Sequence, residues 1–202
     1  MRIFVAIDID PSVRAAIATF MEGVEGFAPD ARWVRPESLH VTLKFIGEKT
    51  ESEVEAIKKA LVEVRGESIR IAMRGHGFFP TARSARVFWI GVEAGPALEA
   101  LAKGIDNATA SLGIPREDRL FSAHLTLARG GDGSGNRRRQ KNDKPNRSFQ
   151  RLQEKLAAMP ALDFGTMTAR EFSLFQSHLG RGGPRYEKLA SIALNNAGRA
   201  VS

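Results

Sequence analysis

The pattern of apolar and polar positions repeats along this chain of 202 residues. Short β-prone apolar runs occur at 3–7 (IFVAI) and at 87–91 (VFWIG), 87 − 3 = 84 residues apart. A stripe of apolar residues at helical spacing follows each run, with Pro11 and Pro96 near the two predicted helix starts. The two stripes consist of Val13, Ile17, Phe20, Met21 and Val24, and of Leu98, Leu101, Ile105 and Leu112. The pattern therefore predicts a strand followed by a helix twice.

The same order continues beyond these helices. Segments 38–45 (SLHVTLKF) and 122–129 (SAHLTLAR) share the frame Ser-x-His-apolar-Thr-Leu and are typical of strands. A second helix is predicted in each half, and strand-like runs at 68–79 and 162–175 follow. The apolar positions of these helices are Val54, Ile57, Leu61 and Val64, and Phe149, Leu152 and Leu156.

This order predicts a duplicated β-α-β-α-β chain of the α+β class. We expect a single domain at 1–202, made of repeat lobes at about 1–84 and 85–202, between which strands are free to cross. Each lobe is expected to hold a mixed or antiparallel sheet with helices outside. A pseudo-twofold axis would then leave a central cleft between the lobes.

The second half contains an extra segment. Matching Phe78 to Phe175 raises the offset to 97, which is 97 − 84 = 13 residues more than before. The excess falls in a Gly-rich run without apolar periodicity, which predicts a flexible basic insertion at about 130–146. Between 130 and 150 the net charge is +4, from Arg137, Arg138, Arg139, Lys141, Lys144 and Arg147 against Asp132 and Asp143. Such a run favours a polyanionic partner or is a solvated loop without one.

Composition limits the remaining function classes. The net charge is +7, and the absence of cysteine excludes disulfides and thiolate metal sites. The first residues, MRIFVAIDID, read as a strand and not as a signal peptide. No apolar run is long enough to span a bilayer, so we expect a cytoplasmic protein.

The two His-x-Thr pairs are the candidate chemistry. Because side chains alternate along a strand, His40 and Thr42 share one face, and so do His124 and Thr126. Opposed lobes would bring two imidazoles and two hydroxyls together. A metal site usually needs more ligands, and a Ser-His-Asp site needs one histidine. Two imidazoles can act as acid and base near neutral pH, and hydroxyls suit phosphate oxygens.

A single His-x-Thr pair on a strand is often a satisfied polar pair without catalytic function. Two such pairs with matching flanks, in register with a repeat of the whole chain, are much harder to explain in that way. The set fits metal-free phosphodiester chemistry.

These residues resemble the 2H phosphoesterase superfamily, and more closely its LigT-like RNA 2′,3′-cyclic phosphodiesterases, also called 2′-5′ RNA ligases. The likeness covers nearly the whole chain, with family-like segments at 1–9, 33–48, 121–129 and 182–190. It implies two α/β lobes with a central cleft. It also implies hydrolysis of RNA 2′,3′-cyclic phosphate ends to a 2′-phosphate, with a weak reverse 2′-5′ ligation that needs no ATP.

The resemblance also implies residue roles. His40 would donate a proton to the leaving O3′, His124 would activate water, and Thr42 and Thr126 would hold phosphate oxygens. Spacing alone does not choose between the histidines. Arg129 matches a family arginine that would bind phosphate, although strand parity puts it on the apolar side unless the strand ends or bends there.

Two other candidates near the motifs, Lys44 and Phe45, have two interpretations each. Lys44 shares parity with His40 and either lines the cleft or is solvated, and Phe45 either stacks on a base or belongs to the core. His76 and His178 lie in turn-like contexts and are predicted at the surface. Packing is the predicted role of Trp33, Trp89 and Tyr186.

Two alternatives remain open beside the RNA-end phosphodiesterase. One is the same chemistry on a small cyclic nucleotide or nucleotide-sugar cyclic phosphate, and the other is an RNA-binding module with vestigial histidines. The expected partner is RNA with 2′,3′-cyclic phosphate ends, tRNA fragments among them. We expect no cofactor, no metal and no membrane partner, and a monomer.

Overall fold

The computed structural model describes residues 1–130, 147–178, 180 and 184–194. The expected insertion falls largely at 131–146, outside the described residues. The strands are β1 (Arg2–Asp8), β2 (Arg32–Trp33), β3 (His40–Glu48), β4 (Ile69–Phe79), β5 (Val87–Glu93), β6 (His124–Arg129), β7 (Asp163–Ala169), β8 (Glu171–His178) and β9 (Arg185–Ala193). The helices are α1 (Pro11–Val24), α2 (Glu51–Val62), α3 (Gly95–Ala110) and α4 (Gln150–Ala157), with 3-10 turns η1 (Glu25–Phe27), η2 (Pro36–Ser38) and η3 (Arg147–Phe149).

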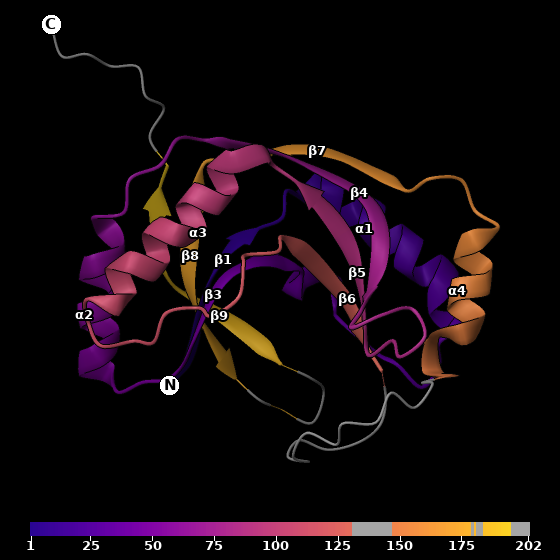
Figure 1. Cartoon of the computed structure of the whole chain (residues 1–202), viewed down its shortest axis with the longest axis horizontal. Helices are drawn as coiled ribbons and strands as arrows, with labels where there is room; N and C mark the ends of the chain where they lie inside the picture. The colour runs from indigo at the N-terminus through magenta and orange to yellow at the C-terminus, as the bar shows by residue number, and fades with distance from the viewer. Residues whose placement is uncertain (131–146, 179, 181–183, 195–202) are drawn as a thin grey trace, which may run out of the picture.

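The strands form two antiparallel sheets, and the protein is of the α+β class. Sheet A has the order β3-β1-β8-β9, and sheet B has the order β2-β6-β5-β4-β7. The sheets do not follow the two halves of the chain, because β4 pairs with β5 and β7 in sheet B while β8 and β9 complete sheet A. The sheets stand side by side in Figure 1, with β3 next to β6 where they meet.

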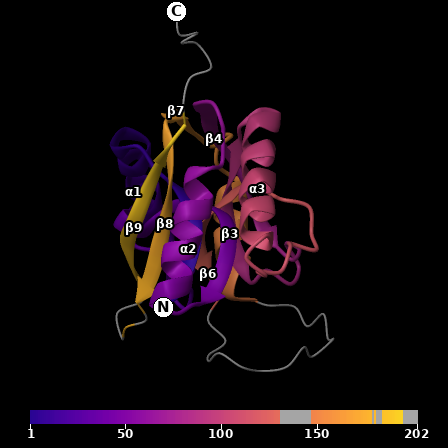
Figure 2. The same ribbon diagram turned by 90° about the vertical axis from the view of Figure 1, so that its left-hand side faces the viewer.

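The helices cover the outer faces of the two sheets. Figures 1 and 2 show α2 and α3 together beside sheet A, where α3 contacts β3 and α2 contacts β9. Helix α1 packs on β7 of sheet B, and α4 lies on the same side of the molecule. Helix α2 begins with a capping box between Thr50 and Glu53, and Pro11 occupies the first turn of α1. No helix in the described ranges is long and apolar enough to cross a bilayer.

The main core lies between these helices and the sheets. The predicted apolar stripe of α1 is buried at Val13, Ile17, Met21 and Val24. A second, small cluster lies on the opposite face of sheet A and consists of Phe4, Ala6 and Phe175, with Tyr186 packed against it. Strand β1 is therefore covered on both faces, and the second face is the one that carries the candidate site.

Candidate active site

The two motif histidines are held in the same way. His40 begins β3 and His124 begins β6, the strands that lie next to each other where the sheets meet. The Nδ1 of His40 lies 2.8 Å from the carbonyl oxygen of Ser38, and that of His124 lies 2.8 Å from the carbonyl oxygen of Ser122. Because a carbonyl oxygen only accepts, Nδ1 is the donor in both rings. Each ring therefore gains and loses its proton at Nε2.

The alternation predicted from the sequence is present at the start of both strands. Val41 and Leu125 are fully buried, whereas His40, Thr42, His124 and Thr126 are partly exposed. Among the described residues, neither threonine hydroxyl has a hydrogen-bond partner. Two hydroxyls without partners in the described part of the chain are suited to a bound anion.

Both strands then lose their simple alternation at the same position of the motif. The pairing of β1 with β3 shifts between Val5 and Ala6, and that of β5 with β6 shifts between Phe88 and Trp89. Each shift inserts one extra residue, as in a β-bulge. The buried positions are consecutive as a result, at Leu43 and Lys44 and again at Leu127 and Ala128.

The bulge in β3 corrects both interpretations of Lys44. Lys44 is only 2% exposed, so it neither lines the cleft nor is solvated. Its ammonium group donates to Asp106 on α3 and to the carbonyl oxygen of Pro115. The bulge turns the next residue, Phe45, to the face of His40, where 60% of it is exposed. Phe45 is therefore not a core residue.

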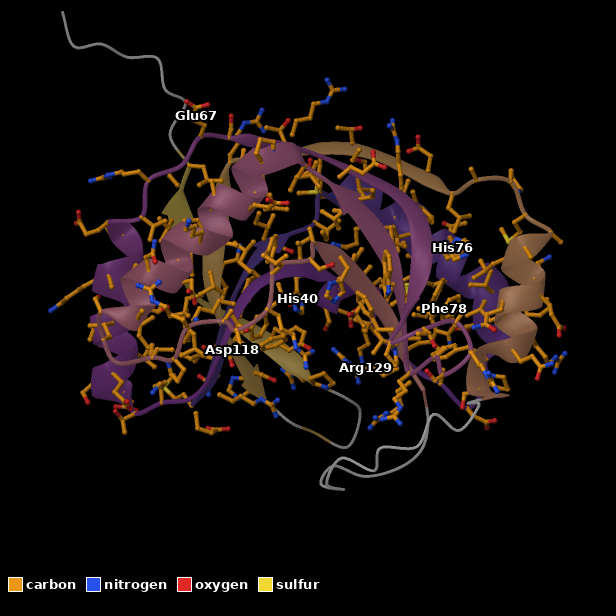
Figure 3. All side chains as sticks on the ribbon, viewed as in Figure 1. His40, Glu67, His76, Phe78, Asp118 and Arg129 are labelled. Atoms are coloured by element: carbon orange, nitrogen blue, oxygen red, sulfur yellow. The ribbon has the colours of Figure 1, made fainter. Side chains whose placement is uncertain are left out.

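The bulge in β6 resolves the parity problem of Arg129. The strand bends before Arg129, which is exposed, as the sequence argument required. Phe45 and Arg129 occupy equivalent positions of the two motifs. Figure 3 labels His40 and Arg129 near the centre of the molecule, one from each sheet.

The pKa of His40 is lowered from its ordinary value. Burial is the largest cause, and the charge of Arg129 on the other sheet contributes. The Ser38 hydrogen bond and the Asp8 carboxylate act in the opposite direction without cancelling the shift. Asp8 faces His40 across β1 and β3 and accepts a hydrogen bond of 2.6 Å from Arg14. His40 of sheet A therefore lies within the electrostatic reach of Arg129 of sheet B.

Aromatic side chains surround His40. The ring centroid of His40 lies 4.8 Å from that of Phe4 and 5.0 Å from that of Tyr186, with Phe175 at 6.4 Å. Tyr186, which the sequence analysis assigned to packing, is thus a neighbour of the site. Burial raises the pKa of the Tyr186 hydroxyl, so it remains protonated. Its position on β9 has no signal in the local sequence beyond the family-like segment around it.

A different aromatic pair lies beside His124. Phe79 and Trp89 stack with centroids 5.0 Å apart, and the Phe79 ring meets His124 edge-on at 5.1 Å. Trp89 lies over Gly77, where a Cβ atom would come within 2.2 Å of the indole. The aromatic surroundings therefore differ between the two motifs although the motifs repeat.

The other two histidines lie outside this arrangement. His76 is exposed, as predicted, but it belongs to β4 and not to a turn. His178 is exposed at the end of β8 and pairs with Glu187 at 2.9 Å. Trp33 packs on Phe88. The described residues contain no group of three or more His, Asp or Glu side chains suited to a metal ion.

The family called LigT like Phosphoesterase matches residues 7–89 and, again, residues 90–186. The chain belongs to this family. The second match begins where the first ends, in agreement with the duplicated architecture. This LigT-like phosphoesterase is 34% identical over 189 residues to the RNA 2′,3′-cyclic phosphodiesterase of Archaeoglobus fulgidus, covering 94% of this chain and 98% of the relative. It is 31% identical over 196 residues to that of Methanothermobacter thermautotrophicus, covering 96% and 99%.

Solved structures resemble this LigT-like phosphoesterase over nearly their whole length. A protein of Thermus thermophilus, TT0787, aligns with a TM-score of 0.76 at 28% identity, covering 98% of this chain and 100% of the other. LigT of E. coli complexed with 3′-AMP aligns with a TM-score of 0.74 at 25% identity, covering 96% and 97%. These similarities agree with the two-lobed 2H phosphoesterase fold.

Proposed function

We propose that this protein hydrolyses the 2′,3′-cyclic phosphate at RNA ends and leaves a 2′-phosphate. The observation that carries the proposal is the matched anchoring of His40 and His124 through Nδ1, which directs both proton transfers to Nε2. The names of the archaeal relatives support the substrate class. Since E. coli LigT is complexed with 3′-AMP, a nucleotide monophosphate is a ligand compatible with the fold.

In the proposed reaction, His124 takes a proton from water, which attacks the phosphorus. The bond from phosphorus to O3′ breaks, and His40 supplies the proton that O3′ needs. Thr42, Thr126 and Arg129 hold the phosphate oxygens as charge develops on them. With a 5′-hydroxyl in the place of water, the same two proton transfers would join it to the cyclic end as a 2′-5′ bond.

The lowered pKa of His40 bears on these roles. An acid must hold its proton, and burial together with Arg129 disfavours the protonated form in the free protein. A bound phosphodiester brings a negative charge close to both groups, which opposes the effect of Arg129. We therefore infer that His40 gains its proton when the substrate binds.

The test is a set of histidine variants on a cyclic mononucleotide. His40→Ala and His124→Ala are each expected to lower turnover on the order of 10²- to 10⁴-fold, the usual share of a general acid or base. The double variant should lose less than the two losses combined, because the groups act as a unit. Near-full activity of either folded single variant would contradict the two-histidine mechanism.

Product analysis tests the direction of cleavage. Phosphorus NMR distinguishes a 2′-phosphate from a 3′-phosphate, and the proposal expects the 2′ isomer. A 3′-phosphate would mean that the substrate lies the other way round between the two histidines.

A second candidate function keeps the chemistry but takes a small cyclic nucleotide as substrate. The partly exposed site and the exposed Phe45 accommodate a single nucleotide equally well. Comparing kcat/KM for a cyclic-phosphate RNA and a cyclic mononucleotide separates the two. Binding of RNA without turnover of either would favour the RNA-binding module instead.

A further inference from the structure

Lys44 lies in the first His-x-Thr strand but takes no part in the chemistry proposed above. Its side chain points to the helix-covered face of sheet A and is almost completely buried, at 2% exposed. The ammonium group donates to the Asp106 carboxylate and, at 2.9 Å, to the carbonyl oxygen of Pro115. One charged group of β3 therefore holds both helix α3 and the segment that follows it.

Asp106 also contacts the segment that follows α3. Its Oδ1 accepts the backbone N–H of Glu117 at 3.2 Å, and its Oδ2 lies 3.6 Å from Arg116. Residues 115–117 are thus held by Lys44 and Asp106 together. Figure 3 labels Asp118, the next residue, in front of β3 and on the same side of the molecule as His40.

The segment held in this way leads directly to the second motif. Between Glu117 and His124 there are six residues, and Ser122 among them supplies the carbonyl that fixes Nδ1 of His124. Leu120, within these residues, is 97% exposed. Phe121 and Ala123, on either side of Ser122, are partly buried against the core. The position of the Ser122 carbonyl therefore depends on two anchors, this packing and the contacts that hold residues 115–117.

We propose that Lys44 and Asp106 are positioning residues that couple the two motifs, since they fix the segment that sets the orientation of His124 relative to β3. The inference rests on the proposed function, in which both histidines act on one phosphate. A buried ion pair is weak evidence of a role in stability, because desolvation offsets much of the attraction. The pair of Lys44 and Asp106 lies between the two motifs, and this location assigns it a positioning role.

The test compares Lys44→Met, Asp106→Ala and the double variant Lys44→Met/Asp106→Leu. Asp106→Ala leaves the buried charge of Lys44 unpaired, whereas Lys44→Met leaves a partly exposed Asp106 that still lies near Arg116. The apolar double variant is expected to recover much of the thermal stability that Asp106→Ala loses. Turnover should not recover, since the segment is no longer held. We expect kcat to fall by up to about 100-fold in all three, as for a small misplacement of a catalytic group, with a smaller change in KM. The control Lys49→Met removes a lysine whose pair with Glu53 is at the surface, and it should leave kcat unchanged.

A readout without turnover keeps this test separate from the proposed function. The imidazole signals of His124 in ¹H–¹⁵N NMR spectra should shift in the folded double variant, and those in Lys49→Met should not. A double variant with wild-type kcat, or with unchanged His124 signals, would overturn the positioning role. If the wild type hydrolyses no cyclic phosphate, the proposed function fails, and the NMR comparison still decides whether Lys44 and Asp106 orient His124.

Discussion

Phe45 provides a sharp test of how the site holds its substrate. The bulge in β3 places this side chain on the face of His40, with 60% of it exposed. An exposed phenylalanine on the same face as the proposed proton donor is suited to stack on a nucleobase. We expect Phe45→Ala to weaken substrate binding much more than it weakens the fold.

The expected loss of folding stability follows from the exposure of Phe45, and the expected loss of substrate binding follows from base stacking. Truncating a fully buried phenylalanine costs ~3–5 kcal/mol of folding stability. Since 60% of Phe45 is exposed, roughly 40% of that cost, or about 1–2 kcal/mol, is the expected loss. Stacking on a base contributes ~1–3 kcal/mol, which corresponds to a rise in KM of about 5- to 150-fold.

The assay is KM and kcat for a purine cyclic mononucleotide, together with thermal denaturation of the same samples. The matched control is Val62→Ala, because Val62 is 56% exposed at the end of α2 and belongs to neither motif strand. The control should leave KM unchanged. If Phe45→Ala loses stability while KM stays at the wild-type value, Phe45 is a packing residue and the stacking argument is wrong.

Three further predictions follow. The pKa of His40 is below its ordinary value of about 6.5, so kcat/KM should fall with rising pH through a value below about 6.5 if His40 is the acid. Arg129→Met should move that falling limb to higher pH, and a shift of the rising limb in its place would make His40 the base. Because the proposed mechanism assigns both proton transfers to imidazoles, activity should survive EDTA, and a loss restored by a divalent ion would contradict this. Neutralising Arg137, Arg138, Arg139 and Lys141, which lie outside the described residues, should raise KM for longer RNA and flatten its salt dependence, while KM for a mononucleotide stays the same.

The local sequence determined much of the site. The repeat of Ser-x-His-x-Thr predicted two strands with one polar face each, and the first residues of these strands have the predicted alternation. The duplicated order of strands and helices is also present, because helical and strand periodicities depend on residues close together in the chain. The run predicted at 162–175 is the exception, since it divides into β7 and β8, which belong to different sheets.

The tertiary structure decided which residues join the histidines. A bulge depends on how a strand pairs with its neighbour, so strand parity alone placed Lys44 in the cleft and Arg129 on the apolar side. Tyr186 approaches His40 because β8, which pairs with β9 as a hairpin, also pairs with β1, a segment far away in the chain. The periodicity of a strand tells which residues share a face up to the first bulge, and beyond it only the pairing of distant segments fixes which face a side chain occupies.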